Sequence, residues 1–252
     1  IGGSNWIYDQ ALTRATTDWD VIFDPWTGLA RPQRLEKAEV YAQQDLPIGV
    51  TYDWVTLTKV ESNAVPADAW IDWNIETQTF VTVGEKYPEG LTSLIKSVAY
   101  YPANLWDVTW HDGSPISIAD FVMGLIMTFD RGNEASPYYD PAAATTLGVF
   151  TTTFKGFKIA SADPLVIEYY TDNWQPDAEN NVTTYWPQYA YGPGAWHTLA
   201  IGLQAEAAGE TAFTQAKAGT LEKDWMSYIS GPTVAILKTY FDTAAAENYI
   251  PY

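Results

Sequence analysis

The strongest pattern in the chain is an apolar stripe with helical spacing over residues 117–131. Apolar side chains recur there at intervals of three and four positions, at Ile118, Phe121, Val122, Leu125, Ile126 and Phe129. This spacing predicts an amphipathic helix of about three turns. Ser117 suits the N-cap and Asp120 the third helical position, and Arg131-Gly132 marks the C-terminal end.

Alternation of apolar and polar residues predicts β-strands elsewhere. Residues 155–160 and 165–170 alternate on either side of Ser161-Ala-Asp-Pro164, which is typical of a β-hairpin. Residues 50–60 and 78–83 are rich in β-branched and aromatic side chains and are also expected to contain strands.

Residues 105–110 form another predicted strand, which leads into a tight turn. Asp112-Gly113 lies at the centre of this turn, because glycine adopts positive φ freely and an aspartate side chain can accept backbone N–H bonds. The strand, the turn and the capped helix are therefore expected to form one local unit.

Helical patterns return in the last fifty residues. Residues 204–217, 221–229 and 232–248 are each expected to form a helix, with Pro232 in the first turn of the last one. The apolar face of that last helix would consist of Ile236, Leu237, Tyr240, Phe241 and Ala244. Because strands and helices mix without a strict β-α-β rhythm, the sequence predicts an α/β or mixed α+β fold.

Composition and charge exclude several classes of function. The chain has 252 residues, 31 of them acidic and 13 basic, and its net charge is −18. This balance disfavours binding to nucleic acid or to anionic lipid, because both need clustered Lys and Arg. The chain has no cysteine, which excludes disulfides, thiolate nucleophiles and thiolate metal sites. No apolar run reaches the roughly 20 residues that a membrane-spanning helix needs.

Few residue combinations suggest catalysis or metal binding. His111 and His197 are the only histidines, and neither has a second metal ligand at helical or turn spacing. Glycine motifs for nucleotides and the serine-hydrolase motif are absent. Asp68 and Asp72, which lie beside two tryptophans, are the best candidates for an acid/base pair, and a solvated turn is the simpler interpretation. We therefore expect no catalytic residue, no metal and no cofactor.

Aromatic residues are unusually frequent in this chain. It contains 12 Trp and 17 Tyr, and many of them occur in polar segments. Such side chains either anchor loops on the core or form flat platforms for sugars and peptides. The set as a whole favours some aromatic residues that line a binding cleft.

The turn and the helix carry a resemblance to a known family. Trp110-His-Asp-Gly-Ser-Pro115, followed by Ser117-Ile-Ala-Asp-Phe-Val122, resembles the hallmark of the family 5 extracellular solute-binding proteins of ABC transporters. Members of that family bind peptides, nickel or oligosaccharides. Residues 157–168, 2–9 and 24–28 are similar to further segments of the family. Together these segments cover most of the first two thirds of the chain.

The resemblance implies one lobe of a type II periplasmic-binding-protein-like fold, with a mixed sheet, helices packed on it and a family-specific subdomain. Family members have two lobes and are considerably longer, so residues 1–252 would be a partial solute-binding domain cut from a longer chain, without the second lobe. The structural motif would consist of Trp110, His111, Asp112, Gly113, Pro115 and Asp120. The wall of the ligand site would consist of Trp6, Tyr8, Arg131, Tyr138 and Tyr139, in which Arg131 could grip a carboxylate.

The implied function is a non-catalytic receptor that delivers a peptide or an oligosaccharide to an ABC importer. Its partners would be that solute and the transporter permease, and its location would be outside the cytoplasmic membrane, with membrane contact only through a tether beyond these residues. An alternative is a carbohydrate-active enzyme or carbohydrate-binding module that uses Trp platforms and the Asp68–Asp72 pair. A structural surface domain is a third candidate.

Overall fold

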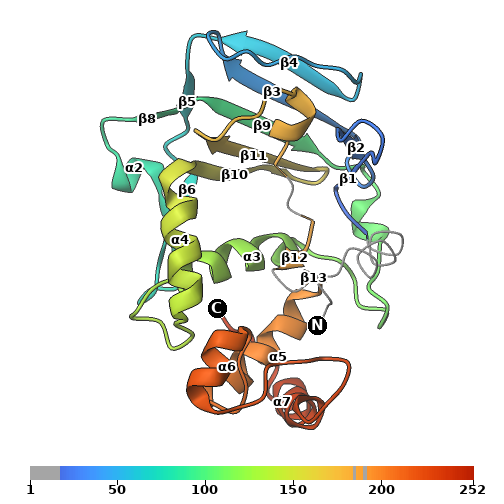
Figure 1. Ribbon diagram of the computed structural model, residues 1–252, viewed down its shortest axis with the longest axis vertical. Helices are drawn as coiled ribbons and strands as arrows, with labels where there is room; N and C mark the ends of the chain where they lie inside the picture. Colours follow the sequence, from blue (N-terminus) through green and yellow to red (C-terminus); the bar gives the residue numbers. More distant parts are fainter. Residues whose placement is uncertain (1–17, 184–185, 190–191) are drawn as a thin grey trace. The chain divides into compact units, whose positions relative to one another are not determined.

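The chain divides into two compact units, which are described separately. The computed structural model describes residues 18–183, 186–189 and 192–252. Within these, residues 18–118 and 149–186 form the sheet unit, and residues 119–148 and 187–252 form the helical unit (Figure 1). Strands dominate the first unit and helices the second, so the mixed α+β class predicted from the sequence is confirmed.

A seven-stranded mixed sheet is the framework of the sheet unit. Its strand order is β4-β3-β9-β11-β10-β6-β7. Only β3 and β4 pair in parallel, and every other neighbouring pair is antiparallel. The strands are β3 (Lys37–Gln43), β4 (Val55–Val60), β6 (Trp70–Asn74), β7 (Thr79–Thr82), β9 (Ile95–Tyr100), β10 (Phe154–Ala162) and β11 (Leu165–Thr171).

Smaller elements surround this sheet. Two short antiparallel pairs are formed by β1 with β2 and by β5 with β8. Their bounds, with those of the helical turns, are β1 (Val21–Phe23), β2 (Ala30–Pro32), β5 (Asn63–Val65), β8 (Leu91–Ser93), α2 (Val83–Lys86), η1 (Leu105–Asp107) and η2 (Ala178–Asn181). Thr82 and Glu85 form a reciprocal capping box at the start of α2.

The predicted hairpin at residues 155–170 is confirmed and lies in the interior of the sheet. Strands β10 and β11 pair antiparallel, and β11 also pairs with β9. Phe157, Leu165 and Ile167 are almost fully buried, which explains the alternation seen in the sequence. The expected strands at residues 50–60 and 78–83 are present as β4 and β7, although both are shorter than the pattern suggested.

The predicted strand at residues 105–110 is wrong. Leu105–Asp107 forms a 3₁₀ turn instead, and only Thr109 makes a strand-like bridge, to Pro115. Local backbone hydrogen bonds explain the difference, since the N–H groups of Leu105 and Val108 donate to carbonyls three residues earlier. These short-range bonds use the donors that a strand would offer to a neighbour.

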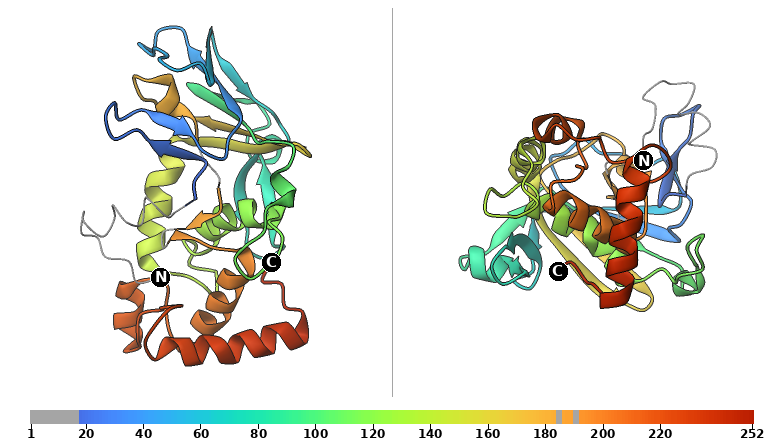
Figure 2. Two further views of the ribbon diagram at one scale, coloured as in Figure 1. Left: turned by 90° about the vertical axis from the view of Figure 1, so that its right-hand side faces the viewer. Right: turned by 90° about the horizontal axis from the view of Figure 1, so that it is seen from below.

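The helical unit is built around α3 and the helices near the C-terminus. Its elements are α3 (Ile118–Asp130) and α4 (Pro141–Thr153), each of which crosses the unit boundary at one end, with β12 (Gln188–Tyr189), β13 (Gly192–Pro193), α5 (Trp196–Ala207), α6 (Gln215–Leu221) and α7 (Thr233–Glu247). Helix α7 runs across α5 (right-hand view of Figure 2). Their shared core contains Met123, Met127, Leu199, Leu203, Phe213, Met226 and Leu237.

Helix α3 matches the sequence prediction in position, while the Ser117 N-cap stays a prediction. It begins at Ile118, and Asp120 stands in its first turn as expected. Its buried surface differs from the predicted stripe, because Ile118 is 37% exposed while Met123 and Met127 enter the core of the helical unit. The stripe therefore located the helix but described only part of its packing.

The C-terminal helices agree with the prediction in part. Helix α7 is confirmed, although Phe241 on its predicted apolar face is 53% exposed. The expected helix at 204–217 is split between α5 and α6, and Gly209, with φ of +70°, lies in the break. The expected helix at 221–229 is wrong, because Glu222 adopts the left-handed conformation that ends α6. No helix among the described residues is long and apolar enough to cross a membrane.

Candidate functional site

The motif that carries the family resemblance forms a tight turn in the sheet unit. Trp110 N–H donates to the carbonyl of Ser114 at 2.8 Å, and Gly113 N–H donates to the carbonyl of Trp110 at 2.9 Å. Oδ1 of Asp112 accepts both the N–H and the hydroxyl of Ser114, at 2.9 and 2.6 Å. Gly113 has a φ of +85°. Asp112 and Gly113 therefore stabilise the turn itself, while His111 and Pro115 are exposed on it.

Replacing Gly113 by alanine is expected to lower the free energy of unfolding by about 1 kcal/mol, because alanine resists the positive φ of this position. Gly148 is a matched control, since it lies in α4 with ordinary φ, and an added methyl group would meet no other atom within 4 Å. Gly148→Ala should leave stability unchanged or raise it slightly. Urea unfolding followed by circular dichroism measures both variants, and equal effects would contradict the turn geometry.

Asp120 has a long-range role in the helical unit. Its side chain is 1% exposed, and Oδ1 accepts the backbone N–H of Trp196 at 2.8 Å. This bond satisfies one of the free N–H groups at the start of α5. His197 follows in the first turn of α5, where its ring makes an edge contact with Trp196.

Arg131 belongs to a group of buried ionised side chains in the helical unit. We define the charge cluster as Arg131, Asp140, Glu206 and Lys217. A terminal nitrogen of Arg131 lies 3.0 Å from Oδ2 of Asp140 and 3.4 Å from Oε1 of Glu206, and Lys217 Nζ lies 2.9 Å from the same Glu206 oxygen. The side chains of Asp140 and Glu206 are fully buried, and that of Arg131 is 8% exposed. Each positive charge therefore has a carboxylate partner inside the unit.

Both carboxylates of the charge cluster also accept hydrogen bonds from uncharged donors. Asp140 accepts the hydroxyl of Thr214 at 2.6 Å and the N–H of Ala142 at 2.9 Å. Glu206 accepts the N–H of Phe213 at 2.7 Å, and the Arg131 guanidinium lies over the Phe213 ring. The cluster thus joins the end of α3, the start of α4, α5 and α6.

The residues predicted to form the wall of the ligand site differ in their surroundings. Tyr138 adjoins the charge cluster that contains Arg131, because Lys217 of that cluster donates to the carbonyl of Tyr138. Tyr138 is buried, and this burial raises the pKa of its hydroxyl, whereas Tyr139 is half-buried. Trp6 and Tyr8 lie outside the described residues. A ligand-binding role for these residues stays a prediction. The guanidinium of Arg131 already pairs with two carboxylates of its own chain, those of Asp140 and Glu206.

Asp68 and Asp72 do not form a pair in the sheet unit. Asp68 lies on an exposed turn and pairs with Lys158 at 2.7 Å, while Asp72 lies in β6 and pairs with Lys86 at 2.5 Å. The solvated-turn interpretation therefore holds for Asp68, whereas Asp72 lies in a strand. Among the described residues, no three His, Asp or Glu side chains are placed to hold a metal ion.

The tryptophans beside these aspartates pack within the protein. Trp70 stacks on Phe80 with ring centroids 4.1 Å apart, and Trp73 meets the same ring edge-on at 4.9 Å. Trp70 also stacks on Phe157. These rings stabilise the β6 end of the sheet by burial and stacking, which is the anchoring role and not the platform role.

Among the residues that the structure describes, the most exposed aromatic side chain lies instead on the β1–β2 hairpin of the sheet unit. Trp26 is 95% exposed and Phe23 is 66% exposed. The loop between the strands is folded tightly, because Oδ1 of Asp24 accepts the N–H groups of Trp26 and Thr27 and Gly28 N–H donates to the Asp24 carbonyl. The sequence carries a signal for this turn in Asp24-Pro-Trp-Thr-Gly28, but nothing in it indicates how far Trp26 would project.

Arg31 and Tyr52 contact this loop and stabilise it. Nε of Arg31 donates to Oδ2 of Asp24 at 3.3 Å, and its guanidinium lies 3.5 Å from the centre of the Tyr52 ring. The Tyr52 hydroxyl is 3.0 Å from Oγ1 of Thr27. The N–H groups of Trp26 and Thr27, with Arg31, hold the pKa of the Asp24 carboxyl below its usual range. The loop is thus a defined structure that presents an aromatic ring to solvent.

Comparison with protein families and with curated proteins finds no relative of the chain. No protein-family model matches the chain, and no curated protein matches it. The resemblance to the solute-binding family therefore rests on the motif residues named above.

Proposed function

We propose that this chain is a non-catalytic solute-binding domain of an ABC importer, with a peptide or an oligosaccharide as its ligand. The observation that supports the proposal is the order of the motif elements along the chain. A tight turn at Trp110–Pro115 is followed directly by α3, and the β10–β11 hairpin then enters the central sheet. This is the succession that the resemblance to the family 5 solute-binding proteins implies.

The proposed fold is one lobe of a type II periplasmic-binding-protein-like architecture. In this proposal ligand contacts stabilise a closed state that the permease recognises, outside the cytoplasmic membrane and without a cofactor. Arg131 and Tyr138 are buried. Direct contact with the ligand would therefore fall to Trp6, Tyr8 and Tyr139, while the charge cluster fixes the segment that carries Tyr139.

Calorimetric titration tests the receptor role. The natural protein that contains this chain is titrated with dipeptides to pentapeptides and with cello-oligosaccharides, and a Kd of about 1 μM or tighter is expected for one class. Residues 1–252 alone should bind at least about 100-fold more weakly, because half of a binding site forfeits contacts without reducing the entropy cost of association.

Three outcomes would contradict the proposal in different ways. No binding by the natural protein would contradict the receptor role. Equal affinity of residues 1–252 would contradict the partial-domain assignment. Release of shorter sugars or peptides during incubation, detected by chromatography, would favour the carbohydrate-active or another enzymatic alternative over a non-catalytic receptor.

A further inference from the structure

We propose that the tip of the β1–β2 hairpin is a surface binding site for a neutral glycan built of pyranose rings. The hairpin tip is defined as residues 23–29, with Trp26 as the platform. This site shares no residue with the proposed solute site, and the proposal does not depend on the proposed function.

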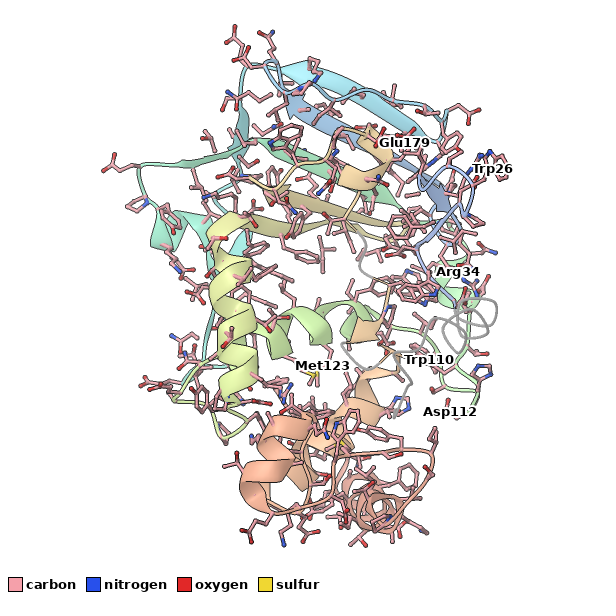
Figure 3. All side chains as sticks on the ribbon, viewed as in Figure 1. Trp26, Arg34, Trp110, Asp112, Met123 and Glu179 are labelled. Carbon is pink, nitrogen blue, oxygen red and sulfur yellow. The ribbon has the colours of Figure 1, made fainter. Side chains whose placement is uncertain are left out.

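Trp26 stands out from the hairpin into solvent (Figure 3). With 95% of its surface exposed, the indole has its faces open to a ligand. Burying such a ring against an apolar surface releases hydration water and is favourable in proportion to the area covered. An aromatic side chain held in this way contributes little to the stability of its own unit, so its surface stays available for a ligand.

The hairpin tip is organised before any ligand arrives. Asp24 fixes the backbone of Trp26 and Thr27, and Arg31 in turn fixes the Asp24 carboxylate. Gly28 adopts a φ of +73°, which closes the loop without strain. Because the backbone around Trp26 is already ordered, binding there costs less conformational entropy than binding to a flexible loop.

The charge of the hairpin tip favours a neutral ligand. Its one charged residue, Asp24, is paired with Arg31, so no unmatched charge remains to attract a cation or an anion. The chain as a whole carries a net charge of −18, which repels anionic polymers and anionic lipid. Three neutral partners remain: a protein surface, a zwitterionic bilayer and a neutral glycan.

The exposed apolar area of the hairpin tip is small for the centre of a protein interface. At 95% and 66% exposure, Trp26 and Phe23 offer together roughly 350 Å² of surface. A stable protein interface needs about 800 Å² from each partner. A bilayer is disfavoured because Asp24, two residues from the indole, is held in its ionised form and would have to leave water with it.

The chemistry of a neutral glycan fits an exposed indole that has polar groups near it. One face of a pyranose ring presents C–H groups that pack on an indole, while its hydroxyls need hydrogen-bond partners at the rim. Asp24 and Thr27 lie on the same loop as Trp26, and the Tyr52 hydroxyl is 3.0 Å from Oγ1 of Thr27. Area for one or two sugar rings and a polar rim therefore occur together.

Affinity electrophoresis in native gels that contain hydroxyethyl cellulose, mannan or soluble starch tests the proposal. We expect at least one of these polymers to retard the unmodified chain, Trp26→Ala to weaken the retardation at least tenfold, and Trp26→Phe to retain part of it. Phe241→Ala is the matched control, since Phe241 is an exposed aromatic residue in the helical unit, and it should be retarded normally. Circular dichroism confirms that each variant is folded.

Several results would overturn the proposal. They are no retardation by any of the three polymers, or equal retardation of Trp26→Ala and the unmodified chain. Sedimentation with phosphatidylcholine vesicles that Trp26→Ala abolishes would assign the tip to a bilayer, and a dimer in analytical ultracentrifugation that Trp26→Ala dissociates would assign it to protein contact. Solute titration of Trp26→Ala keeps this proposal separate from the receptor role, because that binding should not change.

Discussion

Replacing Arg131 by methionine is expected to lower the free energy of unfolding by about 3–5 kcal/mol, because it leaves two buried carboxylates with a single cation. Arg131 pairs with both Asp140 and Glu206, and the side chains of these two acidic residues are fully buried. Of these two carboxylates, Lys217 pairs with that of Glu206. Without the guanidinium, Asp140 keeps its hydrogen bonds to Thr214 and Ala142 but has no opposite charge within ion-pair distance among the described residues.

Urea unfolding followed by circular dichroism measures this effect against a matched control. Lys238 pairs with Asp242 on the surface of α7, where both side chains are more than half exposed. Lys238→Met should therefore change stability by about 0.5 kcal/mol or less. Adding Asp140→Asn to Arg131→Met should recover part of the loss, because the asparagine still accepts and no longer carries a buried charge. A loss for Arg131→Met no larger than that of the control would contradict the structural role of the cluster.

Replacing Glu179 by alanine is expected to lower the free energy of unfolding by about 3 kcal/mol, since hydrogen bonds to a charged acceptor are worth about 1.5–3 kcal/mol each. Glu179 lies on η2 and is fully buried in the sheet unit (Figure 3). Its Oε1 accepts the backbone N–H groups of Thr51 and Tyr52 at 2.6 and 2.5 Å. The variant removes both bonds and leaves two donors without their acceptor.

Hydrogen exchange adds a local measurement to the unfolding experiment on Glu179. The amides of Thr51 and Tyr52 should exchange faster in Glu179→Ala, because they lose the oxygen that protects them. Glu179→Gln keeps an accepting oxygen and should lose less stability. Glu61→Ala is the control, since Glu61 is exposed in the same unit and should have little effect. Unchanged protection of both amides in Glu179→Ala would show that the carboxylate does not hold this loop.

Local sequence patterns determined those elements whose contacts lie close together along the chain. Helix α3, the β10–β11 hairpin, helix α7 and the positive φ of Gly113 all follow from spacing or turn chemistry within a dozen or so residues. The mixed fold class follows from the succession of such elements. Where short-range hydrogen bonds competed with the pattern, as at residues 105–110, the strand prediction was wrong.

The tertiary structure alone decided which side chains meet and which remain exposed. Arg131 precedes its partner Glu206 by 75 residues, and Glu179 holds amides 127 and 128 residues away. No periodicity encodes such pairs, because the fold that brings them together depends on the packing of every element between them. The exposure of Trp26 has the same origin: an aromatic ring in a loop packs inward, as Trp70 does, or projects, as Trp26 does, according to whether the fold offers it a neighbouring surface.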